Sequence, residues 1–198
     1  MSERKTDGFQ LIIIAGPNGA GKSTLAPLLL RDKLKLTEYV NADTIALGLS
    51  AFAPENAAME AGRVMLKRLH HLAAQQKSFA FETTLATRSY AKWLRTLIEQ
   101  GYDVHLIYLW LRSPEIAIAR VQERVRAGGH DVPESTIRRR YKRGAENFFA
   151  LYESLATSWS VYDHSLTNAP YCLAMKEAQA ASVIFEANLW RQFCEVAK

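Results

Sequence analysis

The chain has 198 residues and a formal net charge of +5, with 48% hydrophobic and 23% charged residues, so a disordered or collagen-like chain is excluded. The apolar runs are too short to cross a bilayer, the polar N-terminus argues against a secretory signal, and two cysteines do not make a disulfide framework. We therefore expect one cytoplasmic domain over residues 1–198, with no membrane partner.

Short apolar runs alternate along the chain with longer segments of helical pattern. The runs that predict strands are 9–15, 39–41, 78–82, 104–111, 159–162 and 171–175. The segments that predict helices are about 21–31, 44–49, 54–76, 89–100, 113–127, 134–157 and 178–196. Alternation of this kind predicts a three-layer α/β fold with a parallel sheet of about five strands. Ligands bind such a sheet beyond the carboxyl ends of its strands, so the residues that follow strands are the candidates for a site.

A phosphate-binding loop follows the first predicted strand. Residues 16–24 read GPNGAGKST and match the pattern G-x-x-x-x-G-K-[ST] in full. The glycines let backbone N–H groups point at phosphate oxygens, Lys22 is expected to hold the transferred phosphate, and Ser23 is expected to ligate Mg²⁺. The expected nucleotide-binding residues are Gly16, Asn18, Gly19, Ala20, Gly21, Lys22, Ser23 and Thr24. This motif between a strand and a helix predicts a P-loop NTPase fold that binds ATP with Mg²⁺.

The reaction class is narrowed by two missing motifs. GTPases usually read guanine through Asn-Lys-x-Asp, and transporter ATPases carry a Leu-Ser-Gly-Gly-type signature; neither occurs in this chain. A small P-loop kinase or a bare ATPase remains.

Charged residues follow the second and third predicted strands. In small kinases a carboxylate at the place of Asp43 can accept the proton of the acceptor hydroxyl, although Asp is also a favoured helix cap. Glu82 is expected at the floor of the pocket near metal or substrate, with a capping or surface role as the alternative. Arg88, on the next loop, is a candidate to hold an anionic group of the substrate.

The positive charge is concentrated in one segment. Residues 112–143 hold nine basic and four acidic residues, an excess of five that equals the net charge of the whole chain. Eight of the nine are arginines, which suit bidentate phosphate contacts. We interpret residues from about 120 to 143 as a kinase lid that closes over ATP, with a solvated basic face or a nucleic-acid contact as alternatives. The candidate lid arginines are Arg120, Arg124, Arg126, Arg139 and Arg140, whereas His130 is expected to be an ordinary loop residue.

Five segments taken together resemble the zeta-toxin-like family of P-loop kinases, in its short bacterial branch. They are GPNGAGKST (16–24), VNADTIA (40–46), FAFETTLA (79–86), the stretch 108–148 with the Gly-Gly-His-Asp-Val-Pro lid, and VYDHS (161–165). The resemblance implies an ATP-dependent phosphotransferase. Zeta toxins phosphorylate a sugar hydroxyl of UDP-N-acetylglucosamine and are restrained by a small antitoxin, so it also implies a sugar-nucleotide acceptor and an antitoxin partner.

The resemblance assigns roles to residues position by position. Six positions match the family's pattern: Lys22 and Ser23 in the phosphate loop, Asp43 as general base, Glu82 and Thr84 in the sugar-nucleotide site, and Arg124 as first lid arginine. The second lid arginine falls near His130, so Arg126, Arg139 or Arg140 is expected to replace it. The usual Tyr-Asp-Asn-Ser strand end reads Tyr-Asp-His-Ser at 162–165.

Two other functions are compatible with the sequence. One is a metabolic or antibiotic-modifying kinase with an unrelated acceptor. The other is a nucleic-acid-associated ATPase that uses the basic segment to bind phosphodiesters. The second is disfavoured because no aromatic residue interleaves with the arginines before Tyr141, and single-stranded nucleic acids are usually bound on aromatic stacking platforms.

Overall fold

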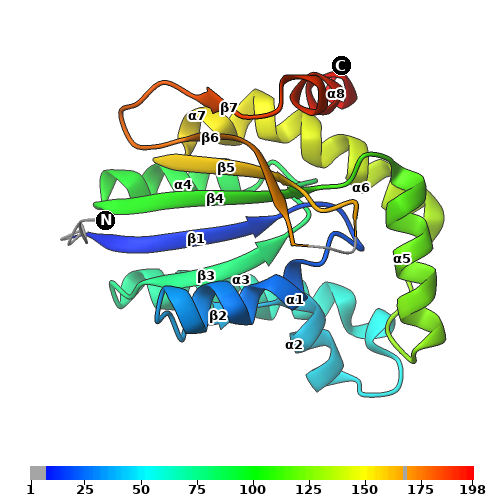
Figure 1. The fold of residues 1–198 in the computed structure, drawn as a ribbon. Coiled ribbons are helices and arrows are strands. Elements are labelled where there is room, and N and C mark those ends of the chain that lie inside the picture. The colour runs from blue at the N-terminus through cyan, green and yellow to red at the C-terminus, as the bar shows by residue number, and fades with distance from the viewer. Residues whose placement is uncertain (1–7, 167–168) are drawn as a thin grey trace.

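Strand β1 (Phe9–Ala15) is an inner strand of the sheet, and its apolar residues Leu11–Ala15 are buried. The computed structural model describes residues 8–166 and 169–198 (Figure 1). Strands β3 (Phe79–Thr83) and β4 (Tyr102–Trp110) pair with β1 in parallel, β2 (Tyr39–Val40) pairs with β3, and β5 (Ser158–Asp163) pairs with β4. These five parallel strands bring their carboxyl ends to one edge of the sheet.

The sheet has seven strands in the described residues, so the expectation of about five is wrong. Strands β6 (Tyr171–Lys176) and β7 (Val183–Ile184) extend it antiparallel to their neighbours, in the order β2-β3-β1-β4-β5-β6-β7. Strand β7 lies inside the segment 178–196 that was expected to be helical, and α8 (Ala187–Val196) begins only after it. Two residues become a strand because they pair with β6, and a local pattern does not reveal that pairing.

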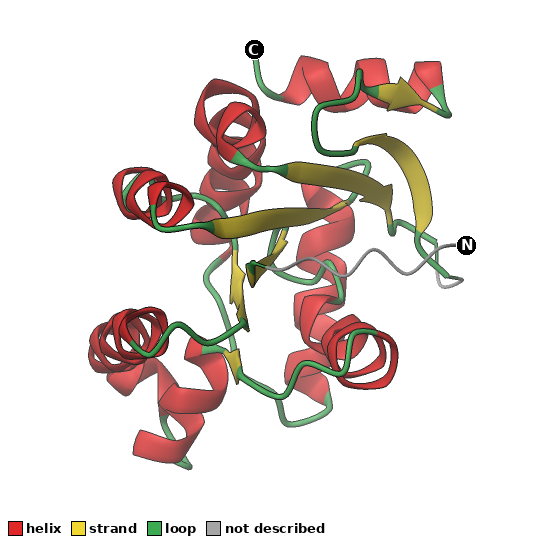
Figure 2. Ribbon diagram, turned by 90° about the vertical axis from the view of Figure 1, so that its left-hand side faces the viewer, coloured by secondary structure: helices red, strands yellow, loops and turns green. Residues whose placement is uncertain are grey.

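Helices cover both faces of the sheet (Figure 2). One face packs against α3 (Ala58–Ala74), α4 (Tyr90–Glu99), the π-helical turn η3 (Phe148–Tyr152) and α8, which together bury the largest apolar core. The other face packs against α1 (Lys22–Ala26) and the π-helical η1 (Pro27–Lys33). The predicted three-layer α/β fold of the P-loop NTPase type is confirmed. No helix in the described ranges is long and apolar enough to cross a membrane.

Several predicted helices are interrupted. The segment expected at 21–31 is α1 followed by η1, because Pro27 has no N–H to donate and the helical turn widens at that point. The segment 54–76 begins as the 3₁₀ turn η2 (Pro54–Ala57) and ends at Ala74. The segment 134–157 consists of α6 (Glu134–Asn147), η3 and α7 (Glu153–Leu155). The remaining helices, α2 (Ala42–Leu49) and α5 (Pro114–Arg126), lie at the carboxyl edge of the sheet (Figure 1).

Candidate active site

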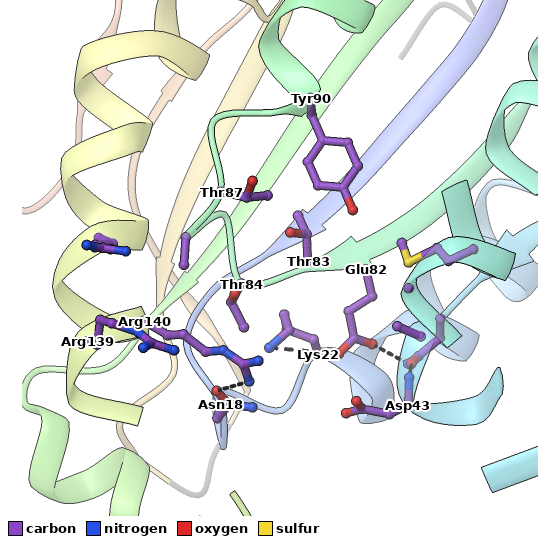
Figure 3. A pocket seen from close by; sticks show the side chains of 16 residues that line it. Asn18, Lys22, Asp43, Glu82, Thr83, Thr84, Thr87, Tyr90, Arg139 and Arg140 are labelled. Carbon is purple, nitrogen blue, oxygen red and sulfur yellow. Dashed lines mark hydrogen bonds and ion pairs between the residues drawn. The ribbon is translucent and has the colours of Figure 1, made fainter. Parts of the chain in front are cut away.

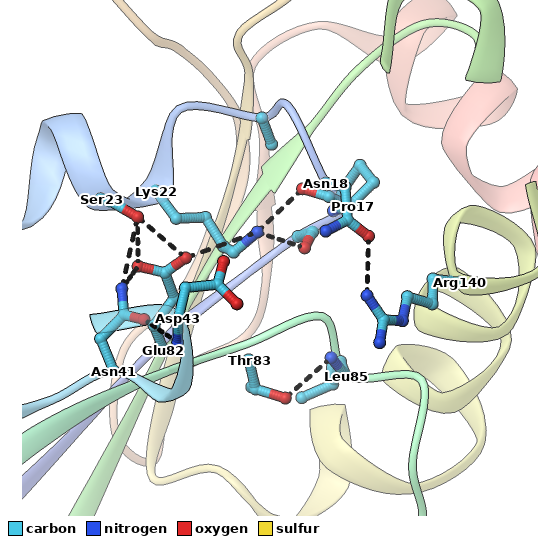
Figure 4. Close-up of polar contacts among 12 residues, drawn as sticks. Pro17, Asn18, Lys22, Ser23, Asn41, Asp43, Glu82, Thr83, Leu85 and Arg140 are labelled. Atoms are coloured by element: carbon cyan, nitrogen blue, oxygen red, sulfur yellow. Dashed lines mark hydrogen bonds and ion pairs between the residues drawn. The ribbon is translucent and has the colours of Figure 1, made fainter. Parts of the chain in front are cut away.

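The phosphate-binding loop joins β1 to α1, and all eight expected nucleotide-binding residues lie on it or on the first turn of α1. The Lys22 side chain is buried, and its Nζ donates hydrogen bonds to the carbonyl oxygens of Gly16 (2.9 Å) and Pro17 (2.8 Å). Burial lowers the pKa of Lys22, and the nearby carboxylates of Glu82 and Asp43 oppose that shift. The loop therefore concentrates one buried cation at the end of β1 (Figure 4).

The end of β5 holds the loop from its other side. The Nδ1 atom of His164 lies 2.7 Å from the carbonyl oxygen of Ala20, which makes Nδ1 the donor. Gly21 has a φ of 81°, and a Cβ there would lie 2.7 Å from His164 Cε1, so only glycine fits. The buried Asp163 accepts hydrogen bonds from Arg112 Nε (2.8 Å) and from Ser165, which fixes the strand end that carries His164. The Tyr-Asp-His-Ser segment is thus part of the wall around the phosphate loop.

Glu82, at the end of β3, gathers three hydrogen-bond donors. Its Oε2 accepts from Ser23 Oγ (2.9 Å), Tyr39 OH (2.6 Å) and Asn41 Nδ2 (2.8 Å), and its Oε1 lies 3.8 Å from Lys22 Nζ. Burial and the Glu82 charge raise the pKa of Tyr39. The carboxylate is therefore held between the phosphate loop and β2, and Glu82 lines the cavity that also contains Lys22.

Asn41, and not Asp43, caps helix α2. The Asn41 Oδ1 accepts hydrogen bonds from the backbone N–H groups of Asp43 (2.7 Å) and Thr44 (3.3 Å). The alternative interpretation of Asp43 as the cap is therefore wrong. The Asp43 carboxylate makes no hydrogen bond or ion pair with any described residue, and it lines the cavity beside Lys22 (Figure 3).

Two arginines of the predicted lid approach the phosphate loop. Arg140, on α6, donates to Asn18 Oδ1 at 3.3 Å (Figures 3 and 4). Arg124, at the end of α5, donates from Nη2 to the carbonyl oxygen of His130 (2.7 Å), and its buried Nε has no partner among the described residues. Both charges lower the pKa of Lys22, and burial lowers the pKa of Arg140 itself. The structure therefore brings these two guanidinium groups toward the buried lysine.

The other candidate arginines lie in different places. Arg120 donates to the carbonyl oxygens of Gly19 (3.4 Å) and His164 (2.7 Å), so it joins α5 to the phosphate loop and the end of β5. Arg126 lines a separate hollow between α5 and the start of α6. Arg139 lines the same cavity as Arg140, and Arg88 lines an adjoining hollow.

Two cavities meet at the candidate base. One, of about 360 Å³, is lined by the phosphate loop, the end of β3 and α6, and includes Thr84. The other, of about 530 Å³, is lined by Ser23, Arg124 and the loop 128–131 between α5 and α6. Asp43 and Arg140 line both cavities. The arrangement provides two adjoining spaces that share one carboxylate and one guanidinium group.

Three residues around this site were assigned no individual role from the sequence. Tyr39 and Asn41 lie two apart at the end of β2, so both side chains point to the same face and reach Glu82. This spacing of two residues at a strand end is the sequence pattern that indicates a shared face for Tyr39 and Asn41. Arg143, which lines the first cavity, was counted in the basic segment but was not singled out. Which face of α6 it occupies depends on how the helix packs.

Comparisons with known proteins place this site in a family. The pattern of AAA_33, described as an AAA domain, matches residues 11–146. The chain belongs to this family. An uncharacterized protein of Haemophilus influenzae is 34% identical to it over 130 residues, which are 66% of this chain and 91% of the relative. The matched region of the AAA domain contains the phosphate loop, Asp43, Glu82, Arg124 and Arg140.

Solved structures share the fold of this AAA domain at low identity. A chain of the AvrRxo1-ORF1:AvrRxo1-ORF2 complex with sulphate ions superposes with a TM-score of 0.78 at 14% identity, over 94% of this chain and 64% of that one. The present chain thus spans just under two thirds of that protein. A chain of the PezAT toxin-antitoxin system of Streptococcus pneumoniae has a TM-score of 0.62 at 13% identity, over 98% of this chain and 89% of that one. The complex of AvrRxo1-ORF1 with its ORF2 partner was also solved with ATP, and it has a TM-score of 0.76 to this chain at 12% identity.

Proposed function

We propose that this protein is an ATP-dependent kinase that transfers the γ-phosphoryl group to a hydroxyl of a small acceptor. One observation carries the proposal: the Asp43 carboxylate, free of partners in the described residues, lines one cavity with Lys22 and Arg140. Phosphoryl transfer requires a cation on the phosphates, a base for the attacking hydroxyl and a cation for the charge that develops on the transferred group. These three side chains have the chemistry for those three tasks.

The nucleotide is expected on the phosphate loop. The backbone N–H groups of the loop and the Lys22 ammonium would bind the phosphate oxygens of ATP. These oxygens would take the place of the Gly16 and Pro17 carbonyl oxygens as hydrogen-bond acceptors for Lys22. The Ser23 hydroxyl and the Glu82 carboxylate, 2.9 Å apart, are oxygen donors of the kind that Mg²⁺ prefers. Within the described ranges no three His, Cys, Asp or Glu side chains form a metal site, which fits an ion that takes its other ligands from phosphate and water. When bound, Mg²⁺ would neutralise charge on the β- and γ-phosphates.

In the proposed transfer step, Asp43 acts as the base and the cationic side chains stabilise the transferred phosphoryl group. The acceptor hydroxyl gives its proton to an Asp43 carboxylate oxygen as its own oxygen attacks the γ-phosphorus. The bond between the γ-phosphorus and the β–γ bridging oxygen breaks, and ADP leaves with the electron pair. Lys22, Arg124 and Arg140 stabilise the charge on the transferred group, and the unpartnered Nε of Arg124 is a donor for it.

For the acceptor we propose UDP-N-acetylglucosamine as the first compound to test, in line with the zeta-toxin-like motifs. Glu82 and Thr84 both line the cavity that would hold it. A small antitoxin is the matching partner. The similarity to the PezAT toxin-antitoxin system, and to a protein solved in complex with its ORF2 partner, supports the choice of a protein partner.

The decisive experiment is incubation of the protein with ATP, Mg²⁺ and a panel of hydroxyl-bearing metabolites that includes UDP-N-acetylglucosamine. Mass spectrometry detects added phosphate, and Lys22→Ala is the matched control. Phosphorylation of one metabolite by the wild type alone supports the proposal. ATP hydrolysis that responds to RNA or DNA, with no phosphorylated metabolite, would instead favour a nucleic-acid-associated ATPase and overturn it.

A further inference from the structure

The basic side chains of the lid segment differ in whether they have partners. Arg138 pairs with Glu115 and Glu134, and Arg120 and Arg124 donate to backbone carbonyls. The remaining partnered residues are Arg112, Lys142 and Arg140. Among the described residues, Arg126, Arg139 and Arg143 make no hydrogen bond or ion pair. Arg139 and Arg143 lie one turn apart on α6 and line the candidate active site, so their charge is available to a ligand.

The candidate active site continues into a groove beyond Arg143. The cavity of about 360 Å³ and an adjoining hollow of about 650 Å³ share Ala86, Thr87 and Arg143. Arg88, on the loop after β3, lines the second hollow together with Arg143 and likewise has no partner among the described residues. Glu146 also lines this hollow, and its Oε1 lies 3.8 Å from Lys142 Nζ, so this ion pair offsets its negative charge. The groove therefore has the transfer site at one end and two unpaired arginines at the other.

The walls of this groove are held at a fixed separation. Gly144 lets α6 approach the loop closely, because a Cβ there would lie 2.6 Å from the carbonyl oxygen of Thr84. Asn147 Nδ2 donates to the carbonyl oxygen of Leu85 (2.9 Å), and Tyr152 OH donates to that of Thr87 (2.6 Å). Three contacts from one helical segment thus position the loop that carries Arg88. A preformed groove loses little freedom when a ligand enters it.

We infer that Arg88 and Arg143 form a binding site for a phosphate group of the acceptor itself. The inference rests on the proposed kinase function and narrows its substrate to an alcohol that already carries a phosphate ester. Arginine forks match phosphate oxygens bidentately, and two of them complement its double charge. Arg143 follows Arg140 by three residues, about 4.5 Å along the helix axis. The hydroxyl that reacts near Arg140 and the phosphate near Arg143 are therefore separated by the dimensions of a small molecule.

A binding experiment tests the site without any transfer. The phosphate loop is first saturated with Mg²⁺ and a non-hydrolysable ATP analogue, and inorganic phosphate is then titrated by calorimetry. The wild type is expected to bind one further phosphate, and Arg88→Gln with Arg143→Gln to weaken that binding by about tenfold or more, since charge-assisted hydrogen bonds are lost. Arg95→Gln, an exposed arginine on α4 that lies outside the groove, is the control and retains the binding. Equal phosphate affinity in all three proteins overturns the inference.

A transfer experiment tests the acceptor class. Matched pairs of alcohols, each as the neutral compound and as its phosphate ester, are compared as acceptors. The ester is expected to be the better acceptor, and the Arg88→Gln/Arg143→Gln variant to raise the KM for the ester with little change in kcat. Equal KM for ester and neutral alcohol overturns the inference while leaving the kinase function intact. Retained phosphate binding with no transfer to any acceptor contradicts the kinase function instead.

Discussion

Replacing Asp43 with Asn separates a catalytic role from a structural one. Asn cannot take a proton, so loss of the base should lower kcat by about 10²–10⁴-fold. The stability cost should be small, because Asp43 is exposed and makes no hydrogen bond with described residues. Its charge in the first turn of α2 is worth about 0.3–1 kcal/mol, which corresponds to a fall in Tm of at most about 4 °C. ATP affinity should be nearly normal, since the phosphate loop supplies most of it.

Asn41→Ala is the matched control for this prediction. That substitution removes the cap of α2 and the hydrogen bond to Glu82, so it should cost about 2 kcal/mol and lower Tm by about 4–8 °C. Thermal melts and phosphotransfer assays on both variants give the comparison. Normal turnover in Asp43→Asn would refute the role of Asp43 as the base. A fall in Tm as large as that of Asn41→Ala would refute the assignment of the cap.

Three further substitutions and one titration test the rest of the site. Lys22→Ala should abolish tight ATP binding without unfolding the protein, and normal turnover in that variant would contradict the kinase function. Arg124→Ala should lower kcat by about 10³-fold with little change in the KM for ATP, and a change in KM alone would show that another group stabilises the transferred phosphate. Gly144→Ala should destabilise the fold by about 1–3 kcal/mol in a thermal melt, because its Cβ would lie 2.6 Å from the Thr84 carbonyl oxygen, and an unchanged Tm would contradict that close approach. Nucleotide phosphates should raise the pKa of Lys22 on binding, so ATP affinity is full at pH values below the Lys22 pKa of the free protein and falls as pH rises through that pKa. Burial lowers the Lys22 pKa of the free protein, so a fluorescence titration should show that ATP affinity begins to fall below pH 10.5. Constant ATP affinity up to pH 10.5 would contradict this prediction.

The features that could be predicted from the sequence are those set by neighbouring residues. The phosphate loop is one continuous motif, so the position of Lys22 at the end of β1 follows from the sequence alone. The strands β1 and β4 were predicted because each is a long apolar run buried among its neighbours. Strand β7 was not, since two exposed residues become a strand only by pairing with β6.

The features that could not be predicted depend on which side of an element faces the site. Arg138, Arg139 and Arg140 are consecutive, yet Arg138 pairs with Glu115 while the other two line the cavity. Each residue of an α-helix is rotated by about 100° from the one before, so the orientation of α6 decides between these outcomes. The cap of α2 shows the same limit, because both Asn41 and Asp43 are favoured capping residues and only the backbone geometry distinguishes them.

The hydrogen bond between His164 and Ala20 joins residues 144 positions apart in the chain. Ala20 lies within the matched region of the AAA domain, which ends at residue 146, whereas His164 lies beyond it. Contacts of such long sequence separation carry a large loop-closure entropy and are slow to form, so the order of folding matters for this site. The phosphate loop is synthesised before β5, and its wall is complete only after β5 has joined the sheet. Nucleotide affinity should therefore appear late in folding, and a chain shortened to end before β5 would keep the whole loop sequence without its binding geometry.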